Sequence, residues 1–581
     1  MRRISLKRNK HMSKIIHLST DAEYYYEKAI QKSDANDYVG CLELLRRAAQ
    51  FVKEPYGEDG LSIRLEIADT YSFMELYEES NREYFKLTAF DYALDEVYYG
   101  IVKNFVLMSM PEEAAHFLNF AVDAGILSPE DGFDPPDLGM LTKPVPSDNI
   151  RLVKSDNGAY ALSIAKQLLN GKDTQFARQM LQSVSEKSEL YAEAINLLAF
   201  IEISEGKTET GLVLCEKALA LNPNDIYALT ARIMALDLSG KRAKAAAYLD
   251  ELDAIGLEEW PDIAKIALCA CQINANETAF KYLAKCMRHA PFDRSIGILY
   301  GIAAANEGEI RTAKHKFVQL QIIYPRDAAV RYFARKTDML NGKKANFVLN
   351  PELPDEVIQD FSKLLDKQLA SITNAVQLNE KMRQDDNFFD AAEWGLYGTE
   401  SAAFPYAAKI GGILALSNSG NALVRDILLD PEYPIVPKKE IFTQLLKSGK
   451  QRVIALSTGD DIRYFRPAPP KEIKTPSLLE AYWRVYSALA FIDMGFDRKL
   501  NLWFRKLALA LKGVRNINID AAAAVLAYKS RINKIFNTQE AVCEVFNLYI
   551  EGDDEDFDAY CAALDAVTGQ ARSKKSTLTK P

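Results

Sequence analysis

A period of about 34 residues in the middle of the chain constrains the fold more than any other feature of the sequence. Between Gly158 and about Pro325, positions one period apart carry side chains of one chemical kind over five successive units. One column is mostly small, a second is mostly glycine and a third is apolar. These columns are Ala165, Ala199, Ile233, Ala267 and Gly301; Gly206, Gly240, Asn274 and Gly308; and Leu181, Cys215, Leu249, Leu283 and Phe317. A repeat of this length is one supersecondary unit, whose apolar face is buried only when neighbouring units stack against it.

The chemistry of the columns predicts a helix, a turn and a second helix in each unit. Small side chains let two antiparallel helices approach closely. The glycines stand where the first helix must end, because glycine readily adopts the positive φ angle found after a helix C-terminus. Pro223, Pro291 and Pro325 stand where the second helix must end, since proline cannot continue a helix.

This pattern resembles the tetratricopeptide repeat (TPR) family, whose unit is a helix–turn–helix of about 34 residues. The sequence departs from the family in lacking its tryptophan and in having Ile233 among the small residues. After the repeats, the segments ILLDPEYPIVPKKEIFTQLLKSGKQRVIAL and AAAAVLAYKSRI are similar to bacterial TPR proteins that end in a helical region of unassigned function. We predict an all-α fold, an α-solenoid of TPR-like helical hairpins followed by a mostly helical C-terminal domain with one β-hairpin.

Weaker copies of the repeat precede the regular run, and about eight hairpins are expected in all. Four pairs of residues in this part lie one period of 34 residues apart: Ala68 and Val102, Ser80 and Ala114, Tyr84 and Leu118, and Leu87 and Ala121. A stretch rich in Pro, Gly and Asp then interrupts the period, which indicates a joint or, alternatively, a binding loop. The predicted organisation is a disordered extension (1–20), N-terminal TPR-like hairpins (21–123), a linker or insertion (124–157), a TPR solenoid with a cap helix (158–345), a helical C-terminal domain (352–568) and a disordered tail (569–581).

Two features of the C-terminal part keep nucleic-acid binding open as an alternative. QRVIALS and DIRYFRPA alternate around Thr458-Gly459-Asp460, which predicts a β-hairpin after the helix in PKKEIFTQLLKSG, the order found in a winged helix. Further on, AAAAVLAYKSRI and the segments after it are compatible with a helix-turn-helix. The would-be recognition segment there, EGDDEDFD, is acidic and would be repelled by phosphates. Charge therefore disfavours this alternative.

Charge and cysteine content place further limits on the class of protein. The chain has 71 basic and 80 acidic residues and a net charge of −9, which argues against a general binder of nucleic acid or anionic membranes. No window approaches the roughly 18 consecutive apolar residues of a membrane span. The seven cysteines are odd in number and scattered, as in a reduced intracellular protein. The first eleven residues lack the apolar segment of a secretory signal, so we expect a cytoplasmic protein.

The motifs predict no catalytic residue, no cofactor and no metal. The five histidines are His11, His17, His116, His289 and His315, and none has a partner at zinc-ligand spacing. SGKRAK and NGKKAN lack the glycine-rich lead of a phosphate loop, and EGDDEDFDAYC lacks the glycine and terminal glutamate of a calcium loop. Cys269 and Cys271 point in different directions on a helix. We predict a non-enzymatic protein, with a site assembled from distant C-terminal positions as an alternative.

One further column predicts where a partner binds. The resemblance implies that the first helices of successive units line a concave face. Residues immediately after the small column would then face the groove, together with those one turn earlier. The predicted partner-binding residues are Phe200, Met234, Leu268 and Ile302, with Asn196, Thr230, Ala264 and Ile298. A continuous apolar stripe in a groove usually marks a binding surface for a helix or an extended peptide. The opposing interpretation is that neighbouring helices or the C-terminal region cover this stripe.

The sequence thus predicts a protein–protein interaction scaffold that binds a peptide or a helix on its concave TPR surface. Some TPR proteins clamp a peptide's terminal carboxylate with a set of Lys and Asn residues, and that set does not appear at these positions. The alternative function is a transcription-related or nucleic-acid-associated adaptor acting through the C-terminal helical domain. The expected partner is a protein or a peptide, and the sequence does not indicate an oligomeric state.

Overall fold

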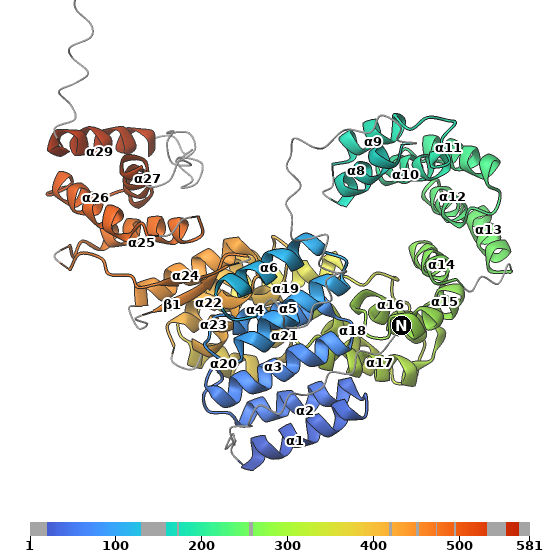
Figure 1. The fold of residues 1–581 in the computed structure, drawn as a ribbon, viewed down its shortest axis with the longest axis horizontal. Coiled ribbons are helices and arrows are strands. Elements are labelled where there is room, and N and C mark those ends of the chain that lie inside the picture. The colour runs from blue at the N-terminus through green and yellow to red at the C-terminus, as the bar shows by residue number, and fades with distance from the viewer. Residues whose placement is uncertain are drawn as a thin grey trace, which may run out of the picture. The chain divides into compact units, whose positions relative to one another are not determined.

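The computed structural model describes most of the chain, and the described residues are almost entirely helical (Figure 1). They are residues 20–128, 158–170, 173–254, 259–417, 421–448, 453–459, 461–471, 473–492, 495–531 and 553–568. Unit 1 combines residues 1–133 with residues 356–581, and unit 2 is residues 134–355. Within the described ranges, no helix has the length and apolar character that crossing a membrane would require. The predicted all-α fold is confirmed.

Parts of the predicted organisation lie outside the described residues. These are residues 1–19, residues 569–581 and most of the predicted linker, 129–157. The same holds for Asp460 of the predicted turn and for Cys543 with the segment around it. The domain boundaries stay predictions.

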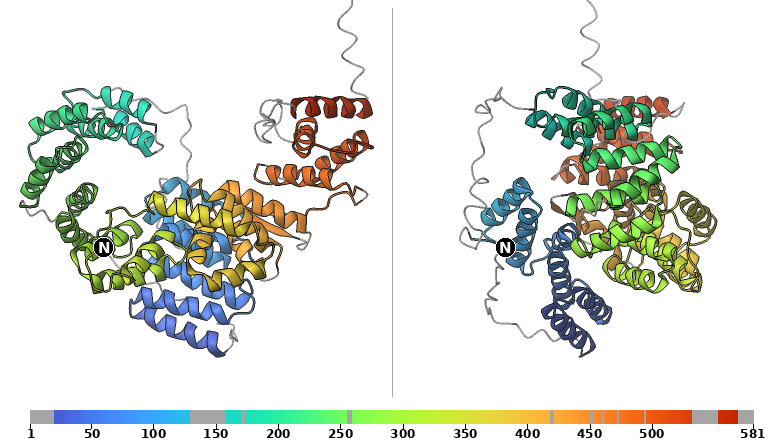
Figure 2. Two further views of the ribbon diagram at one scale, coloured as in Figure 1. Left: turned by 180° about the vertical axis from the view of Figure 1, so that it is seen from behind. Right: turned by 90° about the vertical axis from the view of Figure 1, so that its right-hand side faces the viewer.

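Unit 2 contains five helical hairpins and a closing helix, and successive elements pack against one another (Figures 1 and 2). Its helices are α8 (Ala159–Asn170), α9 (Thr174–Gln182), α10 (Tyr191–Ser204), α11 (Thr208–Leu221), α12 (Ile226–Leu238), α13 (Arg242–Ala254), α14 (Trp260–Gln272), α15 (Asn276–His289), α16 (Arg294–Glu307), α17 (Ile310–Ile323) and α18 (Ala328–Asp338). At the turns, Gly206, Gly240 and Gly308 have φ angles of 78°, 75° and 88°, and Asn274 has 55°. The predicted turn column is confirmed, because all four residues occupy the left-handed region.

The column of small residues lies where the first and second helices of a hairpin meet. Ala199 and Ala267 are buried, and so is the larger Ile233. Gly301 of α16 lies so close to α17 that an added Cβ would come within 2.7 Å of the Phe317 ring. The small side chains therefore set how closely the two helices of a hairpin approach.

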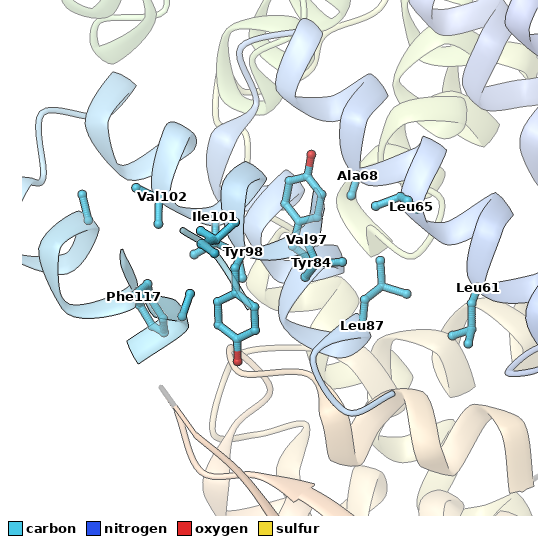
Figure 3. Close-up of a cluster of buried hydrophobic side chains, with 13 residues drawn as sticks. Leu61, Leu65, Ala68, Tyr84, Leu87, Val97, Tyr98, Ile101, Val102 and Phe117 are labelled. Atoms are coloured by element: carbon cyan, nitrogen blue, oxygen red, sulfur yellow. The ribbon is translucent and has the colours of Figure 1, made fainter. Parts of the chain in front are cut away.

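Unit 1 begins with three more hairpins, which brings the number among the described residues to the predicted eight. Their helices are α1 (Thr20–Asp34), α2 (Tyr38–Phe51), α3 (Glu58–Phe73), α4 (Tyr77–Leu87), α5 (Leu94–Leu107) and α6 (Pro111–Asp123). A cluster of buried side chains joins α3 to α6 (Figure 3). Its members include Tyr84 and Leu87 of α4, Val97 and Ile101 of α5, and Phe117 of α6.

The other described residues of unit 1 form helices and one hairpin of strands. The elements are α19 (Asp355–Leu369), α20 (Ala375–Gln384), α21 (Asp386–Tyr397), α22 (Phe404–Ala415), α23 (Asn421–Leu429), α24 (Ile435–Ser448), β1 (Ile454–Ser457), β2 (Ile462–Phe465), α25 (Pro476–Ala490), α26 (Asp497–Ala510), α27 (Ile519–Ser530) and α29 (Asp553–Thr568). The strands are antiparallel, with Ile454 opposite Phe465 and Ser457 opposite Ile462, and they confirm the predicted β-hairpin. The order from α22 to β2 is that of a winged helix.

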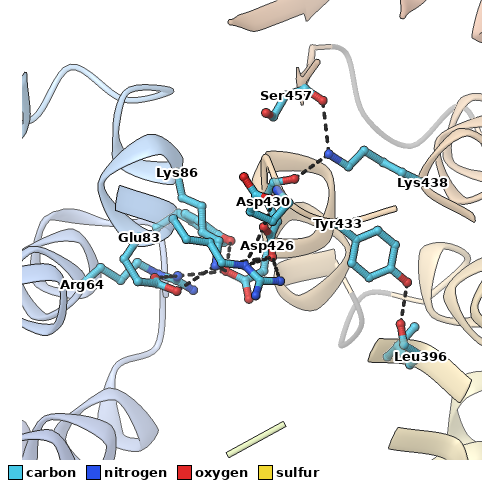
Figure 4. A network of polar contacts seen from close by, with 12 residues as sticks. Arg64, Glu83, Lys86, Leu396, Asp426, Asp430, Tyr433, Lys438 and Ser457 are labelled. Atoms are coloured by element: carbon cyan, nitrogen blue, oxygen red, sulfur yellow. Dashed lines mark hydrogen bonds and ion pairs between the residues drawn. The ribbon is translucent and has the colours of Figure 1, made fainter. Parts of the chain in front are cut away.

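A network of buried and partly buried charges joins the N-terminal hairpins to α23 and to Asp430 just after it, although the two segments are far apart in the sequence (Figure 4). Its cations are Arg64, Arg82 and Lys86, and its anions are Glu83, Asp426 and Asp430. Arg64 Nη1 donates to Asp426 Oδ1 at 2.9 Å, and Arg82 Nε donates to Asp430 Oδ1 at 2.7 Å. Although burial disfavours the charged guanidinium, Asp426 raises the pKa of Arg64, so this side chain stays charged. The cations and anions are equal in number and neutralise one another.

A glycine substitution tests the close approach within a hairpin. Gly301→Ala should destabilise unit 2 by about 1–2 kcal/mol. The new Cβ would clash with the buried Phe317 ring, and the free energy cost of this clash should exceed the gain in helix propensity. The measurement is urea unfolding followed by circular dichroism. In a Phe317→Leu background the same substitution should cost less, since the smaller side chain leaves room. An equal cost in both backgrounds would refute the assignment.

Removing one member of the charge network tests its contribution to stability. Asp426→Ala should cost about 3–5 kcal/mol, because it removes the anion that Arg64 and Lys86 share and leaves the network with an excess positive charge, whereas the double variant Arg64→Met with Asp426→Leu keeps the charges balanced and should cost far less. Glu43→Ala in α2 is the control, since Glu43 and Arg47 form an exposed pair worth at most about 0.5 kcal/mol. Hydrogen exchange of the α23 amides reports the effect. Equal protection in all three variants would contradict this account of the network.

Candidate functional site

The first helix of each hairpin in unit 2 faces the inner side of the arc that these hairpins form, as Figure 1 shows for α10, α12, α14 and α16. Aspartates one repeat period apart cap several of these first helices. Asp293 Oδ1 accepts a hydrogen bond from the N–H of Ile296, and Asp327 Oδ1 accepts one from the N–H of Val330. Asp225 caps α12 in the same way. Such caps satisfy N–H groups that have no partner within the helix, so α12, α16 and the closing helix α18 begin at equivalent points of the repeat, whereas α10 and α14 begin without a side-chain cap.

The four apolar residues of the predicted partner-binding column differ sharply in exposure. Phe200 on α10 is 46% exposed and Leu268 on α14 is 59% exposed, with Met234 on α12 half-buried between them. Ile302 on α16 occupies the equivalent place in the next repeat and is 0% exposed. The apolar column is therefore at least partly exposed to solvent in three repeats and buried in the fourth.

The predicted residues one turn earlier are mostly covered. Ile298 is fully buried and Ala264 is half-buried. Thr230 is buried, and its hydroxyl donates to the carbonyl of Ile226 within the same helix. Asn196 Nδ2 donates to Asp225 Oδ2 at 2.7 Å, so this amide ties α10 to the start of α12. These four side chains are therefore mostly buried and expose little surface to a partner.

Sequence reasoning missed two features of the first helices. One is an exposed apolar residue on α12, and the other is a polar contact that α16 makes with a main chain. Leu238 lies one turn after Met234 and is 52% exposed. Ser204, Leu238, Gln272 and Asn306 follow one another at the repeat distance, so the column could have been found from the period. Its last member, Asn306, is a buried amide that holds the main chain of Phe347 by two hydrogen bonds. The sequence of residues 343–350 contains no pattern that predicts contact between this segment and α16.

The titratable groups near this face offer no reactive centre. Burial raises the pKa of both Cys269 and Cys271 to about 12, so the two thiols stay protonated and are poor nucleophiles. The Cys269 thiol donates a hydrogen bond to the carbonyl oxygen of Thr230, with Sγ and O 3.6 Å apart. Across the part of the chain that the structure describes, no group of three His, Cys, Asp or Glu side chains is arranged to hold a metal ion. The face is suited to non-covalent contact.

Comparisons with known proteins find similarity in fold only. No protein-family model matches the chain, and no curated protein matches it. Among solved structures, the chain is similar to a tetratricopeptide repeat protein from Parabacteroides merdae, with 13% identity and a TM-score of 0.21 over 55% of this chain and 99% of that one. It is also similar to yeast Tom70, with 12% identity and a TM-score of 0.28 over 96% and 97% of the two chains. For Cut9-Hcn1 of the APC/C, the identity is 11% and the TM-score 0.24, over 93% and 96%.

These values do not indicate what the chain binds. The predicted architecture of TPR-like hairpins is confirmed by the elements themselves, which repeat helix, turn and helix once in every period.

Proposed function

We propose that the protein is a non-enzymatic scaffold whose unit 2 binds an apolar segment of a protein partner on its inner face, over α10, α12 and α14. The observation that carries this proposal is the exposure of Phe200 and Leu268 in a column whose next member, Ile302, is fully buried. Exposed large apolar side chains in one row favour a binding surface, because isolated ones would not recur at the repeat distance. The proposed setting is the cytoplasm.

Four side chains are the proposed anchors: Phe200, Met234, Leu238 and Leu268. Burying a side chain of this size contributes roughly 1.5–3 kcal/mol, so a few anchors supply most of the affinity. They stand on helices that are packed against their neighbours, which lowers the conformational entropy lost on binding. Ile298 and Ile302 are left out of the anchor set, because they are already buried. The polar members of the earlier row, Asn196 and Thr230, are proposed to position the helices.

The two alternative functions have less support. A nucleic-acid-associated adaptor would use the winged-helix order in unit 1, but α24, the helix that would enter a groove, buries Ile441, Phe442 and Leu445. Lys438 on the same helix is also buried and donates to the carbonyl of Asp430, so its charge does not face solvent. An enzyme in the C-terminal region would need convergent titratable side chains, and the charges that meet in unit 1 neutralise one another in ion pairs.

Introducing negative charges on the inner face tests the proposed function. The double variant Phe200→Glu with Leu268→Glu should weaken partner binding at least about tenfold, since each carboxylate would be buried against an apolar partner. The matched control is Phe176→Glu with Val213→Glu, which changes exposed apolar residues of α9 and α11, the second helices of their hairpins.

The experiment is quantitative affinity purification from the native cell with mass spectrometry, followed by titration of the purified partner. The proposal predicts that the wild type and the control capture one partner that the double variant loses. Equal capture by all three forms would refute it.

A further inference from the structure

After the closing helix α18, the chain of unit 2 runs back along the C-terminal end of α16 as an extended strand. Residues 343–348 have no helical or sheet structure of their own. The N–H of Ala345 donates to the carbonyl of Ala305 at 2.9 Å, and the N–H of Leu349 donates to Asn274 Oδ1 at 3.1 Å. The strand therefore lies across the ends of two first helices, α16 and α14.

The centre of this contact is a side-chain amide that recognises a main chain. Asn306 Oδ1 accepts a hydrogen bond from the N–H of Phe347 at 2.8 Å, and Asn306 Nδ2 donates to the carbonyl of the same residue at 2.8 Å. Asn276 Oδ1 accepts the other Nδ2 hydrogen at 2.7 Å, which fixes the orientation of the Asn306 amide. Contacts of this kind read an extended backbone, and they do not depend on which side chains the strand carries.

The side chains of the strand alternate between the protein and solvent. Ala345 and Phe347 are half-buried and Leu349 is buried, whereas the residues between them are exposed. The Phe347 ring packs edge-on against Phe333 of α18, with ring centroids 5.8 Å apart. Further along the chain, Glu352 Oε1 lies 2.9 Å from Arg294 Nη1. The site thus accepts a small, an aromatic and an aliphatic side chain at alternate positions, followed by a carboxylate.

We propose that residues 345–349, with Glu352 after the turn that follows Val348, are an internal ligand that occupies a strand-binding subsite at the C-terminal end of the inner face, and that an extended strand of a partner with the same chemistry replaces it. The proposal deepens the proposed function, on which it rests for the existence of a partner. It chooses an extended strand over a helix, because the amide of Asn306 binds both polar groups of one residue, and these are already engaged within a helix.

The fold makes such an exchange feasible. The strand is held by a few main-chain hydrogen bonds and by alternate side chains, so it can open without unfolding the helices beneath it. Because the internal ligand is tethered, its effective concentration is high and it excludes weak competitors. A partner strand that also engages the open anchors on α14 and α12 would have the additional contacts needed to displace it.

The test uses the full chain and a fluorescein-labelled peptide of residues 343–354, KKANFVLNPELP. In the variant Phe347→Ser with Leu349→Ser the internal strand loses its anchors, and this variant should bind the peptide at least tenfold more tightly than the wild type does. Adding Asn306→Ala to the variant should weaken binding at least tenfold. A scrambled peptide of the same composition is the control. If the variant keeps the wild-type circular dichroism yet binds no better, or if Asn306→Ala has no effect, the proposal is wrong.

A second measurement needs no substitution and applies even if the variant fails to fold. In the wild type, the amides of Phe347 and Leu349 should exchange with solvent at least a hundredfold faster than that of Ile302 in α16. Exchange as slow as that of Ile302 would mean that the strand is a permanent part of the fold. The peptide titration and this exchange measurement use no partner protein, so failure of the proposed function and failure of this proposal are distinguishable.

Discussion

A helical hairpin with an apolar face cannot bury that face by itself, and this constraint underlies the structure. Most repeats of unit 2 place a small residue where their two helices meet and larger apolar residues where the next repeat stacks. Stacking leaves Phe200 and Leu268 exposed on the first helices α10 and α14, whereas the equivalent Ile302 of α16 is buried. The inner face is thus a consequence of the repeat, and the sequence of each unit decides whether it is apolar, polar or covered.

The elements that pack against the helical hairpins differ between the two units. In unit 2, α18 covers the last hairpin and the strand after it closes the inner face at α16. In unit 1, α23 lies against α4, and the contact is made largely by charges such as Arg82 and Asp430. Apolar packing is not directional, whereas a balanced set of charges disfavours arrangements that leave a buried charge unpaired. The charge network links α23 to the N-terminal hairpins through charge pairs that match in sign.

The period predicted the hairpins, their turns and the closing helix, because these depend on local chemistry such as the positive φ of Gly308 and the cap at Asp327. It could not predict that Arg64 meets Asp426, since nothing local relates two residues 362 positions apart. For the candidate site, the exposed positions of Phe200 and Leu268 followed from the repeat, but the burial of Ile302 did not. Ile302 has the same place in the repeat as Leu268, so its burial depends on the surroundings of its own unit, which the period does not encode.

The most direct test of this account is a measurement of which inner-face side chains solvent reaches. Carbene footprinting of the full chain, read by mass spectrometry, labels exposed side chains in solution. The account predicts strong labelling at Phe200 and Leu268 and none at Ile298 or Ile302. Protection of Phe200 and Leu268 to the level of Ile302 would contradict it, because the inner face would then already be filled by the chain itself.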